Sequence, residues 1–153
     1  MPTSPLSEFV AADLFKNIRL VATDMDGTLT QLGKFTPALL QAYSNVQCHI
    51  KPLRQDKAAG LLQVLREFFP QYTPEQVLTV GDSPNDETLF DPSYFPVSVG
   101  VANVLDYASQ LTHQPAYVTT SAEGEGFCEL ARYLLDQKSF KVKAENLTRD
   151  VSE

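Results

Sequence analysis

Residues 18–30 read IRLVATDMDGTLT, in which a short apolar run leads directly into two aspartates and a glycine. The run Ile18–Thr23, broken by one arginine, is typical of a buried strand in a parallel sheet, whose two faces are both covered. Asp24 and Asp26 follow the strand, and Gly27 allows the backbone to curl so that both carboxylates can face one cavity. The pattern predicts an α/β fold that carries its chemistry at a strand end.

A second acidic turn, GDSPND (81–86), follows the apolar run Gln76–Val80. Its Asp82 and Asp86 supply the hard oxygen ligands that Mg²⁺ prefers, although an ordinary turn that caps the following helix is an alternative. The first motif has a similar alternative, a turn whose aspartates accept hydrogen bonds from local amides. Because both motifs end strands of what is expected to be one parallel sheet, we favour a shared site over two independent turns.

The rest of the chain alternates between strand-like and helix-like segments. Strands are expected at 18–23, 76–80, 97–101 and 117–120, with a short one at 46–50, and helices at 8–17, 36–43, 56–69, 85–90, 105–110 and 126–135. This order implies a mainly parallel sheet with helices on its faces. The division predicted is a loose lead-in and helix over 1–17, a core over 18–138, and a charged tail over 139–153 that is either frayed or a solvated helix.

The composition indicates a single globular domain. Of the 153 residues, 43% are apolar, and 19 acidic against 12 basic residues give a net charge of −7, which disfavours nucleic acid and anionic membranes as partners. The sequence has neither a signal-peptide pattern at its start nor the roughly eighteen consecutive apolar residues of a membrane helix, so we expect a cytoplasmic protein. Cys48 and Cys128 are interpreted as small buried hydrophobic residues, and His49 and His113 as structural or surface residues.

The motifs DMDGTLT (24–30) and GDSPND (81–86), with Lys57 between them, resemble those of the haloacid dehalogenase-like (HAD) hydrolases, particularly their Cof-type and sugar-phosphate phosphatases. The resemblance runs from about Ile18 to Leu135 and includes the later segment VSVGVAN…AYVTTSAEGEGF. It implies a three-layer, Rossmann-like HAD core with a mainly parallel sheet. It also implies a Mg²⁺-dependent phosphatase that hydrolyses a phosphomonoester, such as a sugar phosphate or another small phosphorylated metabolite.

The resemblance implies a role for each motif residue. Asp24 would be the nucleophile that forms an aspartyl-phosphate, and Asp26 would protonate the leaving group and then activate water. Lys57 would bind the phosphoryl oxygens, with Lys51 and Arg54 as nearby alternatives. The expected ligands of Mg²⁺ are Asp24, the Met25 carbonyl, Asp26, Asp82 and Asp86. The residues expected to contact the phosphate or to support these ligands are Gly27, Thr28, Ser83 and Asn85.

The sequence departs from the family near Tyr43–Val46. A complete member would continue into a second core strand that ends in serine or threonine, and then into a cap domain, whereas this chain passes directly to what resembles the return to the core. We therefore expect no cap domain, weak turnover and broad specificity, because a phosphoryl-oxygen donor and the shield around the leaving group are missing. Ser44 is the nearest hydroxyl, and we do not expect it to substitute.

Two questions stay open, namely what pairs with the first strand and whether the chain is a phosphatase. The first strand loses a neighbour, so either Val46–Ile50 or a second copy of the chain could pair with its edge, the latter giving a homodimer. The chain could also be a catalytically impaired remnant that binds Mg²⁺ and phosphate as an interaction module, or a phosphotransferase that uses the same aspartyl-phosphate. Hydrolysis of an aryl phosphate separates the first of these from a phosphatase, and transfer to a sugar separates the second.

Overall fold

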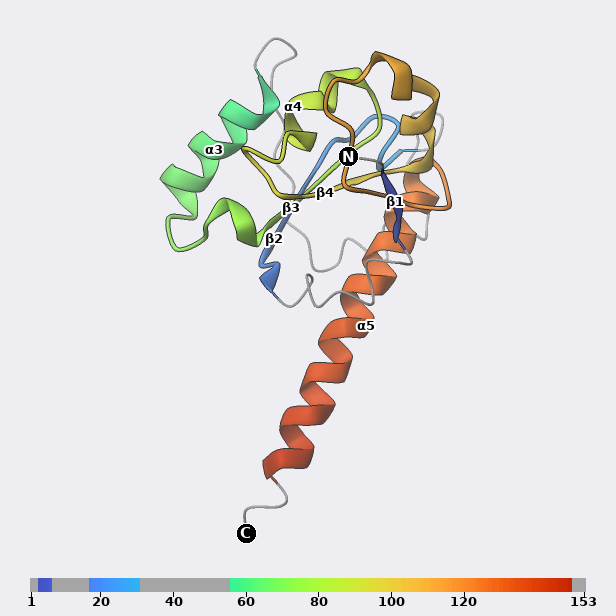
Figure 1. Cartoon of the computed structure of the whole chain (residues 1–153). Coiled ribbons are helices and arrows are strands. Elements are labelled where there is room, and N and C mark those ends of the chain that lie inside the picture. The colour runs from blue at the N-terminus through green and yellow to red at the C-terminus, as the bar shows by residue number, and fades with distance from the viewer. Residues whose placement is uncertain (1–2, 7–16, 31–55, 150–153) are drawn as a thin grey trace.

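The computed structural model describes residues 3–6, 17–30 and 56–149, with side chains as far as residue 136. In these ranges a parallel sheet has the strand order β1-β5-β4-β3-β2 (Figure 1). The strands are β1 (Ser4–Pro5), β2 (Leu20–Thr23), β3 (Val77–Gly81), β4 (Val97–Gly100) and β5 (Tyr117–Val118). The α-helices are α3 (Lys57–Phe68), α4 (Glu87–Phe90) and α5 (Glu123–Arg149), and the 3-10 helices are η3 (Pro74–Gln76), η4 (Pro84–Asp86) and η5 (Ala102–Gln110).

Strand β3 lies between β2 and β4, and all of its residues are buried. The parallel register pairs Thr23 of β2 with Val80 and continues as a hydrogen bond of 3.0 Å from the Asp24 amide to the Val80 carbonyl. Parallel neighbours end at the same edge of a sheet. The acidic turns that follow β2 and β3 therefore emerge side by side.

Alternate residues of β3 belong to two different buried clusters, as expected for a strand covered on both faces. Leu78 and Val80 pack with Phe127 and Leu130 of α5, whereas Val77 packs in a second cluster that includes residues of α3 and α4. In Figure 1, α3 and α4 lie to one side of the sheet and α5 to the other, and α5 extends well beyond the body. The described residues thus form the three-layer α/β architecture that the sequence predicts.

Helix α3 begins where the sequence predicts it. The Asp56 carboxylate accepts hydrogen bonds from the amides of Ala58 and Ala59, at 2.9 and 3.4 Å, and so caps the first turn. The helix ends at Phe68, shortly before Pro70, which cannot continue it. This placement puts Lys57 in the first turn of α3, facing the acidic turns.

The N-terminal lead-in differs from the prediction of a loose segment. Ser4 and Pro5 form β1 at the far edge of the sheet, the Ser4 amide donates a hydrogen bond of 3.2 Å to the Ala116 carbonyl, and Leu6 is buried. Proline is tolerated there because an edge strand leaves half of its backbone groups unpaired. Two residues are too few to produce a periodic pattern, so this strand could not be predicted from the sequence.

Two later helices also differ from their predicted bounds. The short helix predicted at 105–110 is the 3-10 helix η5, which begins earlier, directly after β4. Helix α5 begins at Glu123 and continues through Arg149, so most of the predicted tail is helical. Among the helices that the structure describes, none combines the length and the apolar composition needed to cross a membrane.

Several predictions fall outside the described residues. These are almost all of the helix at 8–17, the helix at 36–43, the strand at 46–50, the junction near Tyr43–Val46, and the candidates Ser44, Cys48, His49, Lys51 and Arg54. The division into lead-in, core and tail also stays a prediction. No second domain lies over the sheet in the part of the chain that the structure describes.

Candidate functional site

Three carboxylates meet at the carboxyl ends of β2 and β3. Asp24 follows β2, Asp82 follows β3, and Asp86 ends η4; one oxygen of each lies within 4.8 Å of the others. Asp82 and Asp86 are buried, whereas the Asp24 side chain is 19% exposed. Hard carboxylate oxygens at this spacing fit a small divalent cation such as Mg²⁺.

Lys57 reaches into this carboxylate cluster from α3. Its Nζ lies 2.7 Å from Asp24 Oδ1 and 2.5 Å from Asp86 Oδ1. Burial alone would lower the pKa of Lys57, but hydrogen bonds and charge attraction from the two aspartates outweigh it and raise that pKa above its ordinary value. Lys57 is therefore charged, offsets part of the negative charge of the cluster and ties the turn after β2 to η4.

The pKa values of the two buried carboxylates, Asp82 and Asp86, are raised. Burial, followed by repulsion from Asp86 and Asp24, raises the pKa of Asp82 to about 6. Burial and the charge of Asp24 likewise raise the pKa of Asp86, against the opposing effect of Lys57. A bound cation would relieve this repulsion, so the charges favour occupation by a metal ion.

The turn after β3 is built around Asp86. Its Oδ2 accepts hydrogen bonds from the amides of Asp82 and Ser83, at 2.9 and 3.2 Å. A Cβ at Gly81 would lie 2.5 Å from the Asp86 Cβ, so glycine is needed for this close approach. Ser83 Oγ donates to Asn85 Oδ1, 2.5 Å away, and the two side chains thereby brace the turn. Ser83 is half-buried and Asn85 is exposed, and neither belongs to the carboxylate cluster.

The turn after β2 contacts Asp82 through two residues. Gly27 has a φ of 79°, and a Cβ there would collide with Asp82 Oδ2, so this position requires glycine for two independent reasons. Thr28 is fully buried, and its Oγ1 donates to Asp82 Oδ1 at 3.3 Å. The structure therefore places both predicted residues against a carboxylate of the cluster.

Two other predicted ligands are not part of the carboxylate cluster. The Met25 carbonyl accepts hydrogen bonds from the amides of Leu29 and Thr30, at 2.9 and 3.1 Å, so both of its lone pairs are engaged within the turn. The Asp26 side chain is exposed and lies outside the group of candidate ligands. Asp26 is therefore in contact with solvent and contributes no side-chain oxygen to the carboxylate cluster.

Asn103 is a site residue to which sequence reasoning assigned no role. Its Nδ2 donates to Asp82 Oδ2 at 2.9 Å and to the Gly27 carbonyl at 3.4 Å, while its Oδ1 accepts from the Glu123 amide at 3.0 Å. Asn103 lies just after β4, the next parallel strand along. Its position shortly after a strand was the one signal in the sequence, and that signal does not indicate which groups Asn103 contacts.

The interpretations of two residues outside the cluster agree with their surroundings. Cys128 is 6% exposed, and burial raises the pKa of its thiol. His113 is partly exposed, with its ring nitrogens 4.0 Å from Glu87 and 3.9 Å from Asp91. Its amide also donates to Glu87 at 3.0 Å, so the described contacts of His113 hold a surface loop.

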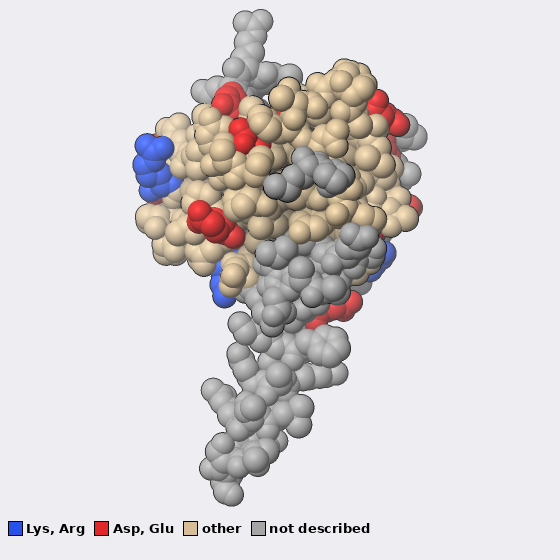
Figure 2. Space-filling view, viewed as in Figure 1, with Lys and Arg blue, Asp and Glu red and all other residues tan. Residues whose placement is uncertain are grey.

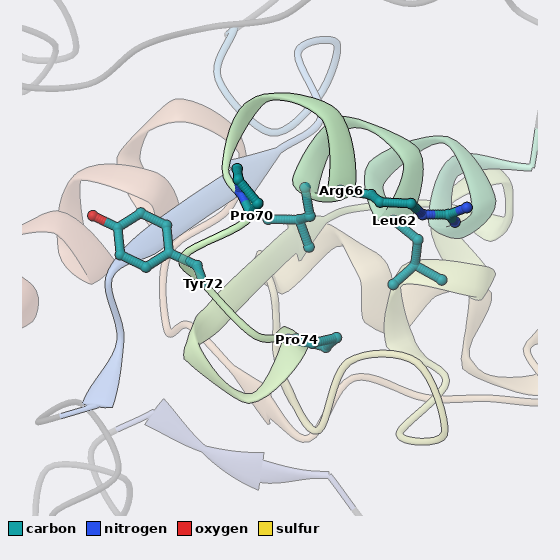
Figure 3. A pocket seen from close by; sticks show the side chains of 6 residues that line it. Leu62, Arg66, Pro70, Tyr72 and Pro74 are labelled. Carbon is teal, nitrogen blue, oxygen red and sulfur yellow. The ribbon is translucent and has the colours of Figure 1, made fainter.

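A pocket of about 310 Å³ lies away from the carboxylate cluster (Figure 3). It lies between the second half of α3 and the segment that enters β3, and its lining residues are Leu62, Leu65, Arg66, Pro70, Tyr72 and Pro74. This is the amino end of β3, whereas the carboxylates lie at its carboxyl end.

On the face shown in Figure 2, acidic and basic side chains of the described residues stand apart and form no basic patch.

Comparison with known proteins gives matches among solved structures alone. No family model matches the chain, and no curated protein matches it. A Moraxella catarrhalis 3-deoxy-D-manno-octulosonate 8-phosphate phosphatase, in complex with magnesium, phosphate and KDO, has a TM-score of 0.64 at 19% identity, covering 93% of this chain and 99% of that one.

Two further solved structures also have a similar fold. The cobalt-bound octulosonate 8-phosphate phosphatase YrbI of Haemophilus influenzae has a TM-score of 0.60 at 18% identity, covering 80% of this chain and 90% of that one. A Legionella pneumophila structure described as a HAD superfamily (subfamily III A) hydrolase has a TM-score of 0.61 at 17% identity, covering 86% and 91%. These similarities show that the chain shares the Rossmann-like α/β fold of the three structures.

Proposed function

We propose that the chain is a phosphatase that hydrolyses phosphomonoesters through an aspartyl-phosphate on Asp24, with Mg²⁺ as its cofactor. The observation that carries this proposal is the meeting of Asp24, Asp82 and Asp86 within 4.8 Å, with Lys57 bonded to two of them. The solved structures with the same fold include phosphatases, one of which is described with magnesium and phosphate and another with cobalt. These similarities support the chemistry by analogy of fold.

In the proposed reaction, an Asp24 carboxylate oxygen attacks the phosphorus while the bond from phosphorus to the leaving oxygen breaks. Asp26 gives its proton to that oxygen, which departs as an alcohol. Asp26 then takes a proton from water, and the resulting hydroxide attacks the phosphorus, releases inorganic phosphate and restores the Asp24 carboxylate. The atoms balance as one phosphomonoester plus one water, giving one alcohol and one phosphate.

The remaining residues orient the reacting groups. Lys57 holds an Asp24 oxygen in place and offers a positive charge to the phosphoryl oxygens. Asp82 and Asp86, with Asp24, would hold Mg²⁺, which when bound neutralises charge on the phosphoryl group. Thr28 fixes the Asp82 carboxylate, and Ser83 and Asn85 brace the turn that carries it.

The substrate class proposed is a small phosphorylated metabolite such as a sugar phosphate. The similar structures support the superfamily and not the Cof-type subgroup that the motifs suggested, so that subgroup is not part of the proposal. No described residue covers the site as a cap, and a site open to solvent favours broad specificity.

The test is hydrolysis of an aryl phosphate by wild type and by Asp24→Asn, with and without Mg²⁺. We expect Mg²⁺-dependent turnover that falls by about 10⁴-fold or more in the variant, because the nucleophile is lost. Asp136→Asn, an exposed carboxylate on α5, is the matched control and should keep wild-type turnover. Circular dichroism confirms that each variant is folded. A folded wild type without Mg²⁺-dependent turnover, or undiminished turnover by Asp24→Asn, contradicts the proposal.

A further inference from the structure

The Asn103 side chain connects three segments that are distant in sequence. Its amide nitrogen lies 2.9 Å from Asp82 Oδ2 and 3.4 Å from the Gly27 carbonyl, and its amide oxygen accepts the Glu123 N–H at 3.0 Å. It thus joins the turn after β3, the turn after β2 and the start of α5. Because α5 packs on the opposite side of the sheet from α3, this contact supports the carboxylate cluster from the side opposite Lys57.

The orientation of the Asn103 amide follows from its partners. A backbone N–H can only donate, so the oxygen of Asn103 must face Glu123, and the NH₂ group must then face Asp82. The opposite orientation would place two oxygens against each other at Asp82 and two donors against each other at Glu123. One hydrogen bond therefore fixes which group Asn103 presents to the carboxylate.

The loop that orients Asn103 is itself firmly held. The Glu129 carboxylate accepts hydrogen bonds from the amides of Thr120 and Ser121, at 3.0–3.1 Å. The Ser121 carbonyl accepts from the Ala102 amide at 3.1 Å, next to Asn103. Glu123 has a φ of 51°, an uncommon value for a residue other than glycine, and its amide points at Asn103. The position of Asn103 thus depends on contacts outside the cluster.

We propose that Asn103 is a positioning residue that orients the Asp82 carboxylate for binding of a divalent cation. Thr28 donates to Oδ1 of Asp82 and Asn103 donates to Oδ2, so the two donors together fix the plane of the carboxylate. The positive charge of Lys57 repels a metal cation that binds to the carboxylate cluster. The Asn103 amide is neutral and adds no such repulsion. Neighbours of metal ligands typically contribute a factor of about 10 to 100 in metal affinity.

The experiment measures the Kd of Mg²⁺ by calorimetry for wild type and Asn103→Ala, with thermal unfolding of both metal-free proteins. We expect Asn103→Ala to raise the Kd by about 10- to 100-fold. Gln114→Ala is the matched control, because Gln114 also uses its side-chain amide to join two segments, donating to the Ala108 carbonyl at 3.2 Å and accepting from Thr3 at 3.1 Å. The control lies outside the cluster and should leave the Kd unchanged.

A role limited to tethering α5 would lower the unfolding temperature without changing the Kd, and that result overturns the inference. Should Asn103→Ala fail to fold, Asn103→Ser, which keeps a polar group one bond shorter, is measured in the same way. The inference rests on the proposed function only for the metal, and binding is measured without turnover. A wild type that binds Mg²⁺ without hydrolysing phosphate therefore refutes the phosphatase and still tests Asn103, whereas a wild type that binds no Mg²⁺ overturns the inference itself.

Discussion

The two acidic turns of the site differ in how firmly the fold holds them. The turn after β3 follows a strand whose residues are all buried, and the Asp86 side chain is 0% exposed. The turn after β2 follows a strand whose residues are all partly exposed, its Asp24 side chain is 19% exposed, and Asp26 is exposed. Similar sequence motifs therefore produce one turn whose carboxylates are buried and one turn whose carboxylates reach solvent.

Under the proposed function, this difference suits the two turns to separate tasks. The turn after β3 holds Asp82 and Asp86 in buried positions, which raises their pKa values. Buried carboxylates held in fixed positions are suited to binding a cation. The turn after β2 leaves the Asp24 side chain partly exposed and the Asp26 side chain exposed to solvent. We infer that the turn after β3 mainly binds the cation and that the turn after β2 mainly performs the chemistry.

The substitution Asp26→Asn tests whether the turn after β2 performs the chemistry, and it should reduce activity strongly. If Asp26 transfers protons and does not bind the cation, kcat should fall by about 10²- to 10⁴-fold while the Kd of Mg²⁺ stays unchanged. Because the side chain is exposed, the unfolding temperature should stay close to that of wild type. Steady-state kinetics and calorimetry on the same preparation check this. A Kd that rises together with the loss of kcat would instead make Asp26 a ligand.

For Asp82→Asn, unlike Asp26→Asn, we expect a change in Mg²⁺ binding. The Kd of Mg²⁺ should rise by about 10- to 100-fold, because a charged ligand is replaced by a neutral one. The metal-free variant should unfold at a higher temperature than wild type at neutral pH, because repulsion from Asp86 and Asp24 is relieved. Thermal unfolding without metal is the decisive measurement. A metal-free variant less stable than wild type would show that the Asp82 charge is not a cost to the fold.

The smallest effect expected is on the pH dependence of metal-free stability. Asp82 has a pKa of about 6 in the fold, above its ordinary value of about 4, so in that interval the folded protein binds a proton that the unfolded chain has lost. The contribution of Asp82 to stability therefore declines as the pH rises from about 4 through about 6, and it stays low above that. Mg²⁺ competes with the same proton, so its binding should strengthen over this interval.

Unfolding temperatures of wild type and Asp82→Asn, measured from about pH 5 to about pH 7, isolate this contribution. The difference between the two proteins should grow in favour of the variant as the pH rises. Parallel curves would mean that Asp82 titrates in the folded protein as it does in the unfolded chain.

The sequence predicts those elements whose pattern is local. The apolar runs at β2, β3, β4 and β5 lie within a few residues of their predicted bounds, and Asp56 marks the start of α3 as an N-cap should. Meeting of the two acidic motifs was also predictable, since parallel strands end at one edge of a sheet. The roles assigned to Asp24, Asp26 and Lys57 stay predictions, because they concern a reaction and not a geometry.

What the sequence leaves out depends on contacts between distant segments. Strand β1 consists of two residues and forms by pairing with the edge of β5. Because β5 lies far along the chain, no local pattern around β1 predicts this pairing. Asn103 resembles any turn asparagine until Glu123 and Asp82 are brought to its two ends. The Met25 carbonyl was predicted as a ligand, and only the backbone path shows that it faces the amides of its own turn.

The strand order has a consequence for how the molecule assembles. Leu20 of β2 pairs with Val77 of β3, far along the chain, whereas β3 pairs with β4 after a much shorter connection. Closing the longer loop costs more chain entropy, so the β3–β4 pair should form earlier during folding and β2 should join later. Asp82 and Asp86 should then be in place before Asp24 arrives, so Asp24 should complete the carboxylate cluster as one of the last steps of folding.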